Sequence, residues 1–306
     1  MSSPSCAIGL DIGSNSFSCA KITTSKDGRT LVTMDTSRPV RLSANLEPGG
    51  ILDKAAIYRG LDALEDLFVE FEMNKYPMRA VGTAALRITS APQDFVTQAK
   101  KIIGVNIEIL SGHDEALLAS KGAVLGLNES DSWIVVDVGG QSTEICWKSK
   151  NTNWSPASIP MGVLSLTKRF LFSQAKSSNQ FDALERYVSK KISEVIPKNL
   201  NGQLVGVAGT ATTLGLLELG LTSWQREKVH GAVVSLKNLN NWIELVQKLP
   251  VKDRISQLGI SARRAEIFPA GLCVIRAVIS HLGKEQIIVS ANGLRVGAAL
   301  SLLQKE

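Results

Sequence analysis

Two short segments, one in each half of the chain, have the composition of phosphate-binding loops. They are Asp11-Ile12-Gly13-Ser14-Asn15-Ser16 and Asp137-Val138-Gly139-Gly140-Gln141-Ser142-Thr143. Glycine lets a backbone turn through positive φ and brings N–H groups close to a ligand. Consecutive N–H groups form an anion-binding nest, to which Ser and Thr hydroxyls add donors. A plain hairpin turn uses the same residue types, but two such segments at corresponding places favour phosphate binding. The candidate phosphate ligands in these loops are Gly13, Ser14, Asn15, Ser16, Gly139, Gly140, Gln141, Ser142 and Thr143.

An aspartate, Asp11 or Asp137, stands just before each loop, at the end of an apolar run. A carboxylate in that place supplies a hard oxygen of the kind that Mg²⁺ prefers, directly or through water. Asp11 and Asp137 are therefore candidate metal ligands, and Mg²⁺ is the expected cofactor.

Glu115 is the candidate general base. It follows Asp114 and the Ser111-Gly112 pair that opens a predicted helix. Carboxylates in a first helical turn are stabilised by the helix dipole, so simple capping is the alternative interpretation. In the functional interpretation Glu115 accepts a proton from an attacking water. Phosphoryl transfer to water needs little beyond positioning, charge neutralisation and an oriented nucleophile.

Two further places could hold phosphate oxygens. Arg87 follows Gly82-Thr83, and the planar fork of arginine suits phosphate, although an ordinary surface arginine is the alternative. Gly209 and Thr210 follow another predicted strand, and the sequence predicts a third phosphate-binding loop there.

The bulk composition limits the ligands and the location of the protein. The net charge of +6 over 306 residues suits a polyanionic ligand, although it is also compatible with an ordinary surface. Aromatic residues are only 5%, and no basic stripe occurs, so we expect no nucleic-acid partner. Neither a membrane-spanning run nor a secretory signal is recognised. Four scattered cysteines indicate reduced thiols, so we expect a cytoplasmic protein.

Apolar periodicity predicts an α/β protein with two lobes. Each half begins with a strand, a glycine loop and a returning strand, as in a diverged internal repeat. Strands alternating with helices predict mixed sheets flanked by helices. We expect lobes over residues 1–125 and 126–306, with the last helix able to pack back on the first lobe. Predicted helices cover residues 54–74, 92–103, 111–126, 163–172, 181–199, 236–248 and 263–282, followed by a C-terminal helix.

The motifs taken together resemble the exopolyphosphatase and guanosine pentaphosphate phosphohydrolase family of the actin-like ATPase superfamily. The resemblance runs nearly end to end and matches the short, two-lobed form. Besides both loops, it rests on Val40-Arg41-Leu42, Gly82-Thr83-Ala84-Ala85-Leu86-Arg87, Ser111-Gly112-His113-Asp114-Glu115-Ala116, Gly209-Thr210-Ala211-Thr212-Thr213-Leu214, Lys228-Val229-His230-Gly231 and Gly293-Leu294-Arg295.

The resemblance implies two actin-like (ribonuclease H-like) lobes with the active site in the cleft between them. It implies Mg²⁺-dependent hydrolysis of a terminal phosphoanhydride in inorganic polyphosphate or guanosine pentaphosphate. By the same resemblance Glu115 is the catalytic base, and Asp11, Asp137 and Glu144 position metal and water. Arg87 would hold phosphate.

Six positions depart from the family pattern, and one of them is Asp114, which stands where glutamate is commoner. Gln141 stands where a third glycine is usual, and Leu117, Ser165, Lys168 and Val296 replace common charged residues.

Three functions remain open beside the leading hypothesis of an exopolyphosphatase. They are guanosine pentaphosphate hydrolysis, a diverged protein that binds polyphosphate or an alarmone without turnover, and an actin-like ATPase or sugar kinase. The sequence does not determine the oligomeric state, and a homodimer is one open form.

Overall fold

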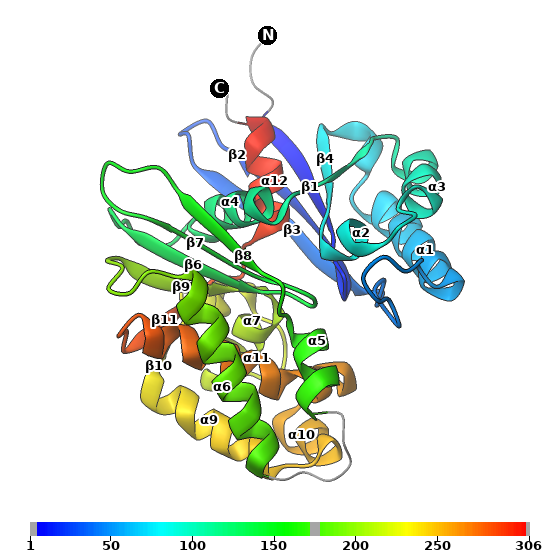
Figure 1. The fold of residues 1–306 in the computed structure, drawn as a ribbon. Coiled ribbons are helices and arrows are strands. Elements are labelled where there is room, and N and C mark those ends of the chain that lie inside the picture. Colours follow the sequence, from blue (N-terminus) through cyan, green and yellow to red (C-terminus); the bar gives the residue numbers. More distant parts are fainter. Residues whose placement is uncertain (1–4, 172–177, 304–306) are drawn as a thin grey trace. The chain divides into compact units, whose positions relative to one another are not determined.

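The computed structural model describes residues 5–171 and 178–303, and the chain divides into two compact units. Unit 1 comprises residues 1–126 and 292–306, and unit 2 comprises residues 127–291. The chain thus passes between the units near Gly126 and again at residues 291–292. The C-terminal helix α12 (Leu294–Leu303) belongs to unit 1, where it packs against β1, β2 and α4 (Figure 1).

Within the described residues, the sheet of unit 1 has five strands in the order β3-β2-β1-β4-β5. The first three form an antiparallel meander, whereas β4 and β5 run parallel to β1. The strands are β1 (Cys6–Ile12), β2 (Ser16–Thr24), β3 (Thr30–Pro39), β4 (Met78–Gly82) and β5 (Ile107–Ile109). The glycine loop of unit 1 is the turn between β1 and β2.

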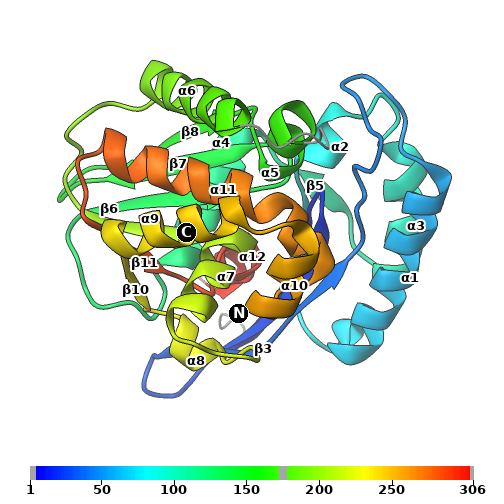
Figure 2. The same cartoon turned by 90° about the horizontal axis from the view of Figure 1, so that it is seen from below.

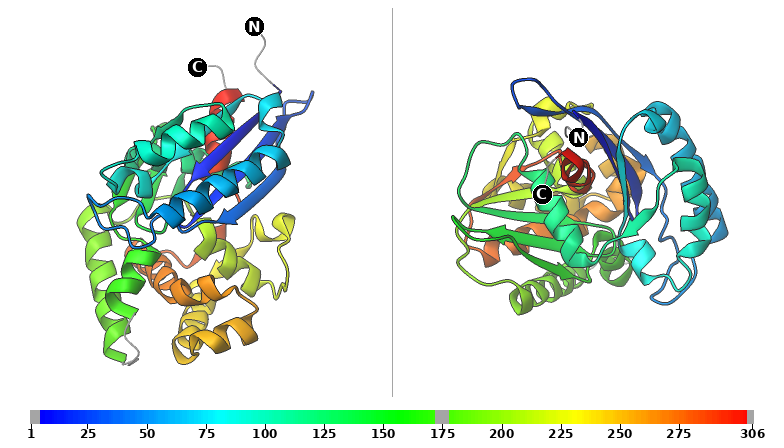
Figure 3. Two further views of the ribbon diagram at one scale, coloured as in Figure 1. Left: turned by 90° about the vertical axis from the view of Figure 1, so that its right-hand side faces the viewer. Right: turned by 90° about the horizontal axis from the view of Figure 1, so that it is seen from above.

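Alternating side chains bury both faces of this sheet. Ile8, Leu10 and Ile12 pack with α1 and α3, and Ala7 on the opposite face packs with α12. Figure 3 shows α1 and α3 side by side on one face of the strands of unit 1. The other elements of unit 1 are α1 (Lys54–Glu70), η1 (Met73–Lys75), α2 (Ala84–Ile88), α3 (Gln93–Ile103) and α4 (Gly112–Ala123).

An ion pair fastens α12 to the meander. The Arg295 guanidinium donates to both carboxylate oxygens of Asp35 on β3, at 2.5 and 2.8 Å. The next residue, Val296, is fully buried with Ala7 in an apolar cluster. The Gly-Leu-Arg segment therefore links α12 to the sheet of unit 1. Val296, one of the departures from the family pattern, lies in the core.

The sheet of unit 2 repeats this topology. Its order over the described residues is β10-β11-β9-β6-β7-β8, in which β6, β7 and β8 form the antiparallel meander and β9 runs parallel to β6. Apart from the added β10, the order matches that of unit 1, which confirms the internal repeat. The strands are β6 (Trp133–Val138), β7 (Thr143–Lys148), β8 (Ser155–Ile159), β9 (Gln203–Val207), β10 (Val233–Ser235) and β11 (Gln286–Val289).

The helix α11 (Ala262–His281) is the centre of the core of unit 2. Its side chains are buried on nearly every side, and it packs against α6, α9 and α10 (Figure 2). The remaining helices are α5 (Val163–Leu166), η2 (Thr167–Leu171, a π-helical turn), α6 (Ser178–Val195), α7 (Ala208–Glu218), α8 (Arg226–Val229), α9 (Leu236–Lys248) and α10 (Val251–Leu258).

Most predicted helices occur, with some differences. The helix predicted over residues 163–172 is α5 followed by the π-helical turn, and residue 172 lies outside the described residues. The helices α2, α7, α8 and α10 were not predicted. None of the described helices is long and apolar enough to cross a membrane.

Candidate active site

The two glycine loops have matching geometry. Gly13 N–H donates to Ser16 O at 3.1 Å, and Gly139 N–H donates to Ser142 O at 3.0 Å. The sequence predicted a positive φ for the loop glycines, and this prediction is wrong. Gly13, Gly139 and Gly140 do not have the positive φ of the left-handed backbone region. Glycine is required for space instead, since a Cβ would lie 2.8 Å from Ser16 O or 2.9 Å from Ser142 O.

Neighbouring backbone holds each loop by its carbonyl groups. In unit 1, Ser14 O accepts from Ser43 N–H, and Asn15 O accepts from the N–H groups of Val40 and Arg41. Because C=O and the following N–H point in opposite directions across a trans peptide, the N–H groups of Asn15 and Ser16 are directed away from that segment. These N–H groups are candidate donors for a phosphate nest.

The loop of unit 2 is held in a related way by the start of α5. Gly139 O and Gly140 O accept from Val163 N–H and Leu164 N–H, at 2.9 and 2.8 Å. The N–H groups of Gly140 and Gln141 therefore point away from α5. Because Gln141 has no positive φ, its side chain is accommodated without backbone strain. Thr143 instead donates its hydroxyl to Met161 O, which is a structural contact.

The departure at Ser165 also has a local role. Its Oγ accepts from Gly162 N–H and donates to Gly162 O, both at 3.0 Å, which caps α5. Lys168 is exposed on the π-helical turn, and Leu117 is half-buried on α4. Nothing in the structure explains the changes at Lys168 and Leu117.

The predicted metal ligands of unit 2 lie directly opposite one another. Asp137 on β6 pairs with Glu144 on β7 in the antiparallel register, so both carboxylates are on the same face of the sheet. Glu144 is 2% exposed. In unit 1 the residue opposite Asp11 is Ser18, which carries no charge. Unit 2 therefore has a carboxylate pair, where the corresponding place in unit 1 has a single aspartate.

The carboxylate pair fits Mg²⁺. Two like charges directly opposite on a sheet repel unless a cation or proton intervenes. Mg²⁺ typically takes one or two protein carboxylates and completes its shell with water and substrate phosphates. The described residues contain no cluster of three or more His, Cys, Asp or Glu side chains arranged to bind a metal. Asp137 and Glu144 would therefore hold a magnesium ion jointly with substrate rather than in a protein cage.

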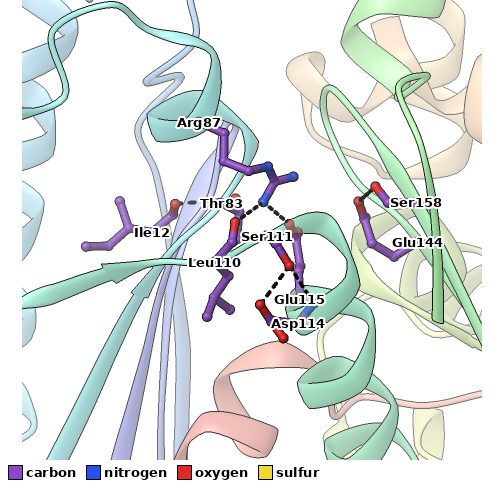
Figure 4. Close-up of polar contacts among 9 residues, drawn as sticks. All are labelled: Ile12, Thr83, Arg87, Leu110, Ser111, Asp114, Glu115, Glu144 and Ser158. Atoms are coloured by element: carbon purple, nitrogen blue, oxygen red, sulfur yellow. Dashed lines mark hydrogen bonds and ion pairs between the residues drawn. The ribbon is translucent and has the colours of Figure 1, made fainter. Parts of the chain in front are cut away.

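Glu115 lies in the first turn of α4, and its side chain is buried. Arg87 Nη1 donates to Glu115 Oε2 at 2.6 Å and to Leu110 O at 2.9 Å (Figure 4). Burial raises the pKa of Glu115, and the nearby Arg87 guanidinium opposes that rise. A buried carboxylate with a raised pKa is a candidate catalytic base.

Helix capping falls to the neighbour of Glu115. Ser111 Oγ accepts from Asp114 N–H at 3.1 Å and donates to Asp114 Oδ2 at 2.7 Å. Asp114 is exposed, whereas Glu115 is buried beside Arg87. Capping and catalysis, the two interpretations of Asp114 and Glu115, therefore apply to different residues. Asp114 takes part in the helix cap, and Glu115 remains the candidate base. Arg87 is a partner of the candidate base rather than an ordinary surface arginine.

The predicted third loop at Gly209 and Thr210 is wrong, because both residues lie in the first turn of α7. Thr210 is 1% exposed and packs against α11, where a Cβ at Gly271 would lie 2.3 Å from its Oγ1. Thr210 is therefore a packing residue. Gly209 remains a candidate through the N–H groups at the start of α7, which attract anions.

Arg264, on α11, was missed from the sequence. A Cβ at Gly209 would lie 1.9 Å from its Nη2, so the guanidinium lies against the first turn of α7. Burial, and secondarily Arg263, lowers its pKa to about 10, so it stays charged at neutral pH. Two arginines in the first turn of a helix oppose the helix dipole, and that pattern is the signal that could have identified Arg264.

The start of α7 also carries backbone strain. Ala208 has φ +63°, a left-handed conformation that costs an L-residue about 1–2 kcal/mol. Ala208→Gly should raise the free energy of unfolding by about 1 kcal/mol after the entropy cost of glycine is subtracted. Urea unfolding followed by circular dichroism measures this change. Ala211→Gly in the same helix should instead lower it by about 1 kcal/mol, and a loss of stability in Ala208→Gly would contradict the strain.

Two mixed-sheet units with one repeated strand order, each with a glycine loop between its first two strands, define an actin-like fold. Residues 21–306 match the model of the Ppx/GppA phosphatase family, and the chain belongs to that family.

Solved structures agree with this assignment. The Ppx/GppA enzyme of Aquifex aeolicus is 25% identical, with a TM-score of 0.84 over 98% of this chain and 99% of that one. An exopolyphosphatase from Cytophaga hutchinsonii is 23% identical, with a TM-score of 0.84 over 97% of both chains. An exopolyphosphatase-like protein reaches a TM-score of 0.85 at 22% identity, over 95% of this chain and 97% of that one. At 23% and 22% identity, the Cytophaga hutchinsonii structure and the exopolyphosphatase-like structure show only that the fold is shared.

Proposed function

We propose that this member of the family is an exopolyphosphatase that removes the terminal phosphate of inorganic polyphosphate with Mg²⁺. The observation that carries the proposal is Glu115, a buried carboxylate whose pKa is raised and which a single arginine holds in place. The carboxylate pair Asp137 and Glu144, beside a glycine loop, supports a site for metal and phosphate in unit 2. The net charge of +6 suits a long anionic substrate.

The proposed reaction is one proton transfer coupled to one displacement. Glu115 Oε1 takes a proton from water, while Arg87 holds Oε2. The water oxygen bonds to the terminal phosphorus as the bridging P–O bond breaks, which releases orthophosphate and a chain shorter by one phosphate. The loop N–H groups hold phosphate oxygens. A bound Mg²⁺, held by Asp137 and Glu144, would neutralise charge on the transferring phosphate.

The substrate is tested by measuring orthophosphate release from long-chain polyphosphate, guanosine pentaphosphate and ATP under identical Mg²⁺ conditions. The proposal predicts the highest kcat/KM for polyphosphate. A higher value for guanosine pentaphosphate would assign that nucleotide instead, and a preference for ATP would indicate an actin-like ATPase. Tight polyphosphate binding without release from any substrate would favour a binding protein.

A reducing, cytoplasmic location is part of the proposal. Cys6, Cys19, Cys146 and Cys273 are all free thiols. Burial raises the pKa of Cys273 to about 12, so that thiol is unreactive.

The pH profile should report the Arg87–Glu115 pair. Glu115 works as an anion, and the Arg87 charge favours that anion. Arg87→Gln should raise the Glu115 pKa further, so the acidic limb of kcat should move to higher pH, in addition to any loss of rate. Arg29→Gln, which removes an exposed arginine paired with Asp27, should leave the limb in place. A limb that stays in place or moves to lower pH in Arg87→Gln would show that Glu115 is not the titrating group.

A further inference from the structure

A row of three polar side chains crosses the meander of unit 2. Asp137, Glu144 and Ser158 occupy paired positions on β6, β7 and β8, so all three are on one face of the sheet. Ser158 Oγ donates to Glu144 Oε1 at 2.9 Å (Figure 4). An ionised carboxylate only accepts hydrogen bonds, so the direction of this one is fixed.

The hydrogen bond determines where each oxygen of Glu144 lies. Oε1 is held by Ser158, toward β8. Oε2 lies on the loop side, since a Cβ built on Gly139 would be 3.9 Å from it. One carboxylate oxygen is thus anchored, and the other is directed to the backbone of the glycine loop.

The repeat in unit 1 provides an internal comparison. The corresponding row is Asp11, Ser18 and Ser37, and Ser18 Oγ donates to Ser37 Oγ at 3.1 Å. A serine on the third strand is common to both rows, but only unit 2 has a carboxylate for that serine to orient. In unit 1 the hydroxyl on the third strand accepts a hydrogen bond from a neutral serine. In unit 2 the hydroxyl at the corresponding position donates a hydrogen bond to the buried carboxylate of Glu144.

We propose that Ser158 is a positioning residue that orients Glu144 for metal binding. The inference rests on the proposed function, because it takes Asp137 and Glu144 as the metal-holding pair. Without the hydroxyl, the Glu144 carboxylate would rotate, and it would lose the donor that offsets its burial. Hydrogen-bonding partners behind metal ligands typically change metal affinity by about 10- to 100-fold.

Mn²⁺ binding to the full chain tests the inference, in the presence of inorganic phosphate as the stand-in for the substrate phosphate that completes the metal shell. An electron paramagnetic resonance titration of free Mn²⁺ compares wild type with Ser158→Ala, Ser158→Thr and Ser37→Ala. Ser158→Ala should weaken Mn²⁺ binding about 10- to 100-fold. Ser158→Thr keeps the hydroxyl and should stay within about threefold of wild type, as should Ser37→Ala, which removes the matching hydroxyl of unit 1. Thermal unfolding checks that each variant is folded.

The outcomes separate this inference from the function. Equal Mn²⁺ affinity in wild type and Ser158→Ala would overturn the inference, while phosphate release by the wild type would leave the function standing. A loss in Ser158→Ala that threonine fails to restore would mean that the effect is packing, and would also overturn it. A wild type without Mn²⁺ binding would remove both the metal assignment and the role of Ser158.

Discussion

Glu115→Gln should lower kcat for orthophosphate release by about 10²- to 10⁴-fold, the range expected when a general base is removed. Glutamine keeps the size of the side chain and can still accept from Arg87, but it takes no proton from water. Polyphosphate binding should persist, since the loops and Arg87 are unchanged. Steady-state kinetics measures the first effect, and calorimetric titration with polyphosphate measures the second.

Asp114→Asn is the matched control for this prediction. It removes a charge one residue away, and asparagine can still accept from Ser111 Oγ. Its kcat should stay within about threefold of wild type, because Asp114 is exposed and takes part only in the helix cap. Equal losses in the two variants would show a general effect of acidic charge, and an active Glu115→Gln variant would exclude Glu115 as the base.

Gly297→Ala should destabilise unit 1 by about 3 kcal/mol or more. A Cβ at Gly297 would lie 1.8 Å from Leu118 O, which is backbone of α4 and has no side-chain freedom to move aside. Gly122 of α4 makes a similarly close approach to Gly293 O, at 2.2 Å from a built Cβ. Forcing α12 and α4 apart would also displace Glu115, so activity should fall together with stability. Urea unfolding measures the loss.

Gly104→Ala is the control for this prediction, because it changes the backbone conformation required of a glycine without creating a close contact. Gly104 caps α3 with φ +75°, and a Cβ there would meet nothing within 4 Å. The cost of that substitution should be about 1 kcal/mol, from the left-handed backbone alone. If Gly297→Ala were no more destabilising than Gly104→Ala, the close contact between α12 and α4 would be wrong.

The sequence was sufficient for the fold class, because its signals are local and repeated. The two loops recur at corresponding places, and strict periodicity indicates helices such as α9, which is correct in both bounds. The helix α7 was missed because Gly209, Thr210, Thr212 and Thr213 all have low helix propensity. Tertiary packing of α7 against β6, β9 and α11 overrides that propensity.

The candidate site was predictable where residue type carries the chemistry. Residue type and the family resemblance together predict Glu115, Arg87 and the loop glycines, and their roles stay predictions. The separate roles of Asp114 and Glu115 were not predictable, since they depend on which carboxylate the fold buries. Ser158 and Arg264 were also missed. The contact of Ser158 follows from strand register, and that of Arg264 follows from helix packing. A short sequence motif predicts neither.

Hydrolysis of polyphosphate in H₂¹⁸O tests the central claim most directly. The proposed reaction predicts orthophosphate carrying one ¹⁸O for each bond cleaved, with loss of that product in Glu115→Gln. A folded wild type that binds polyphosphate with Mg²⁺ and releases no labelled orthophosphate would contradict the claim that this chain is an exopolyphosphatase.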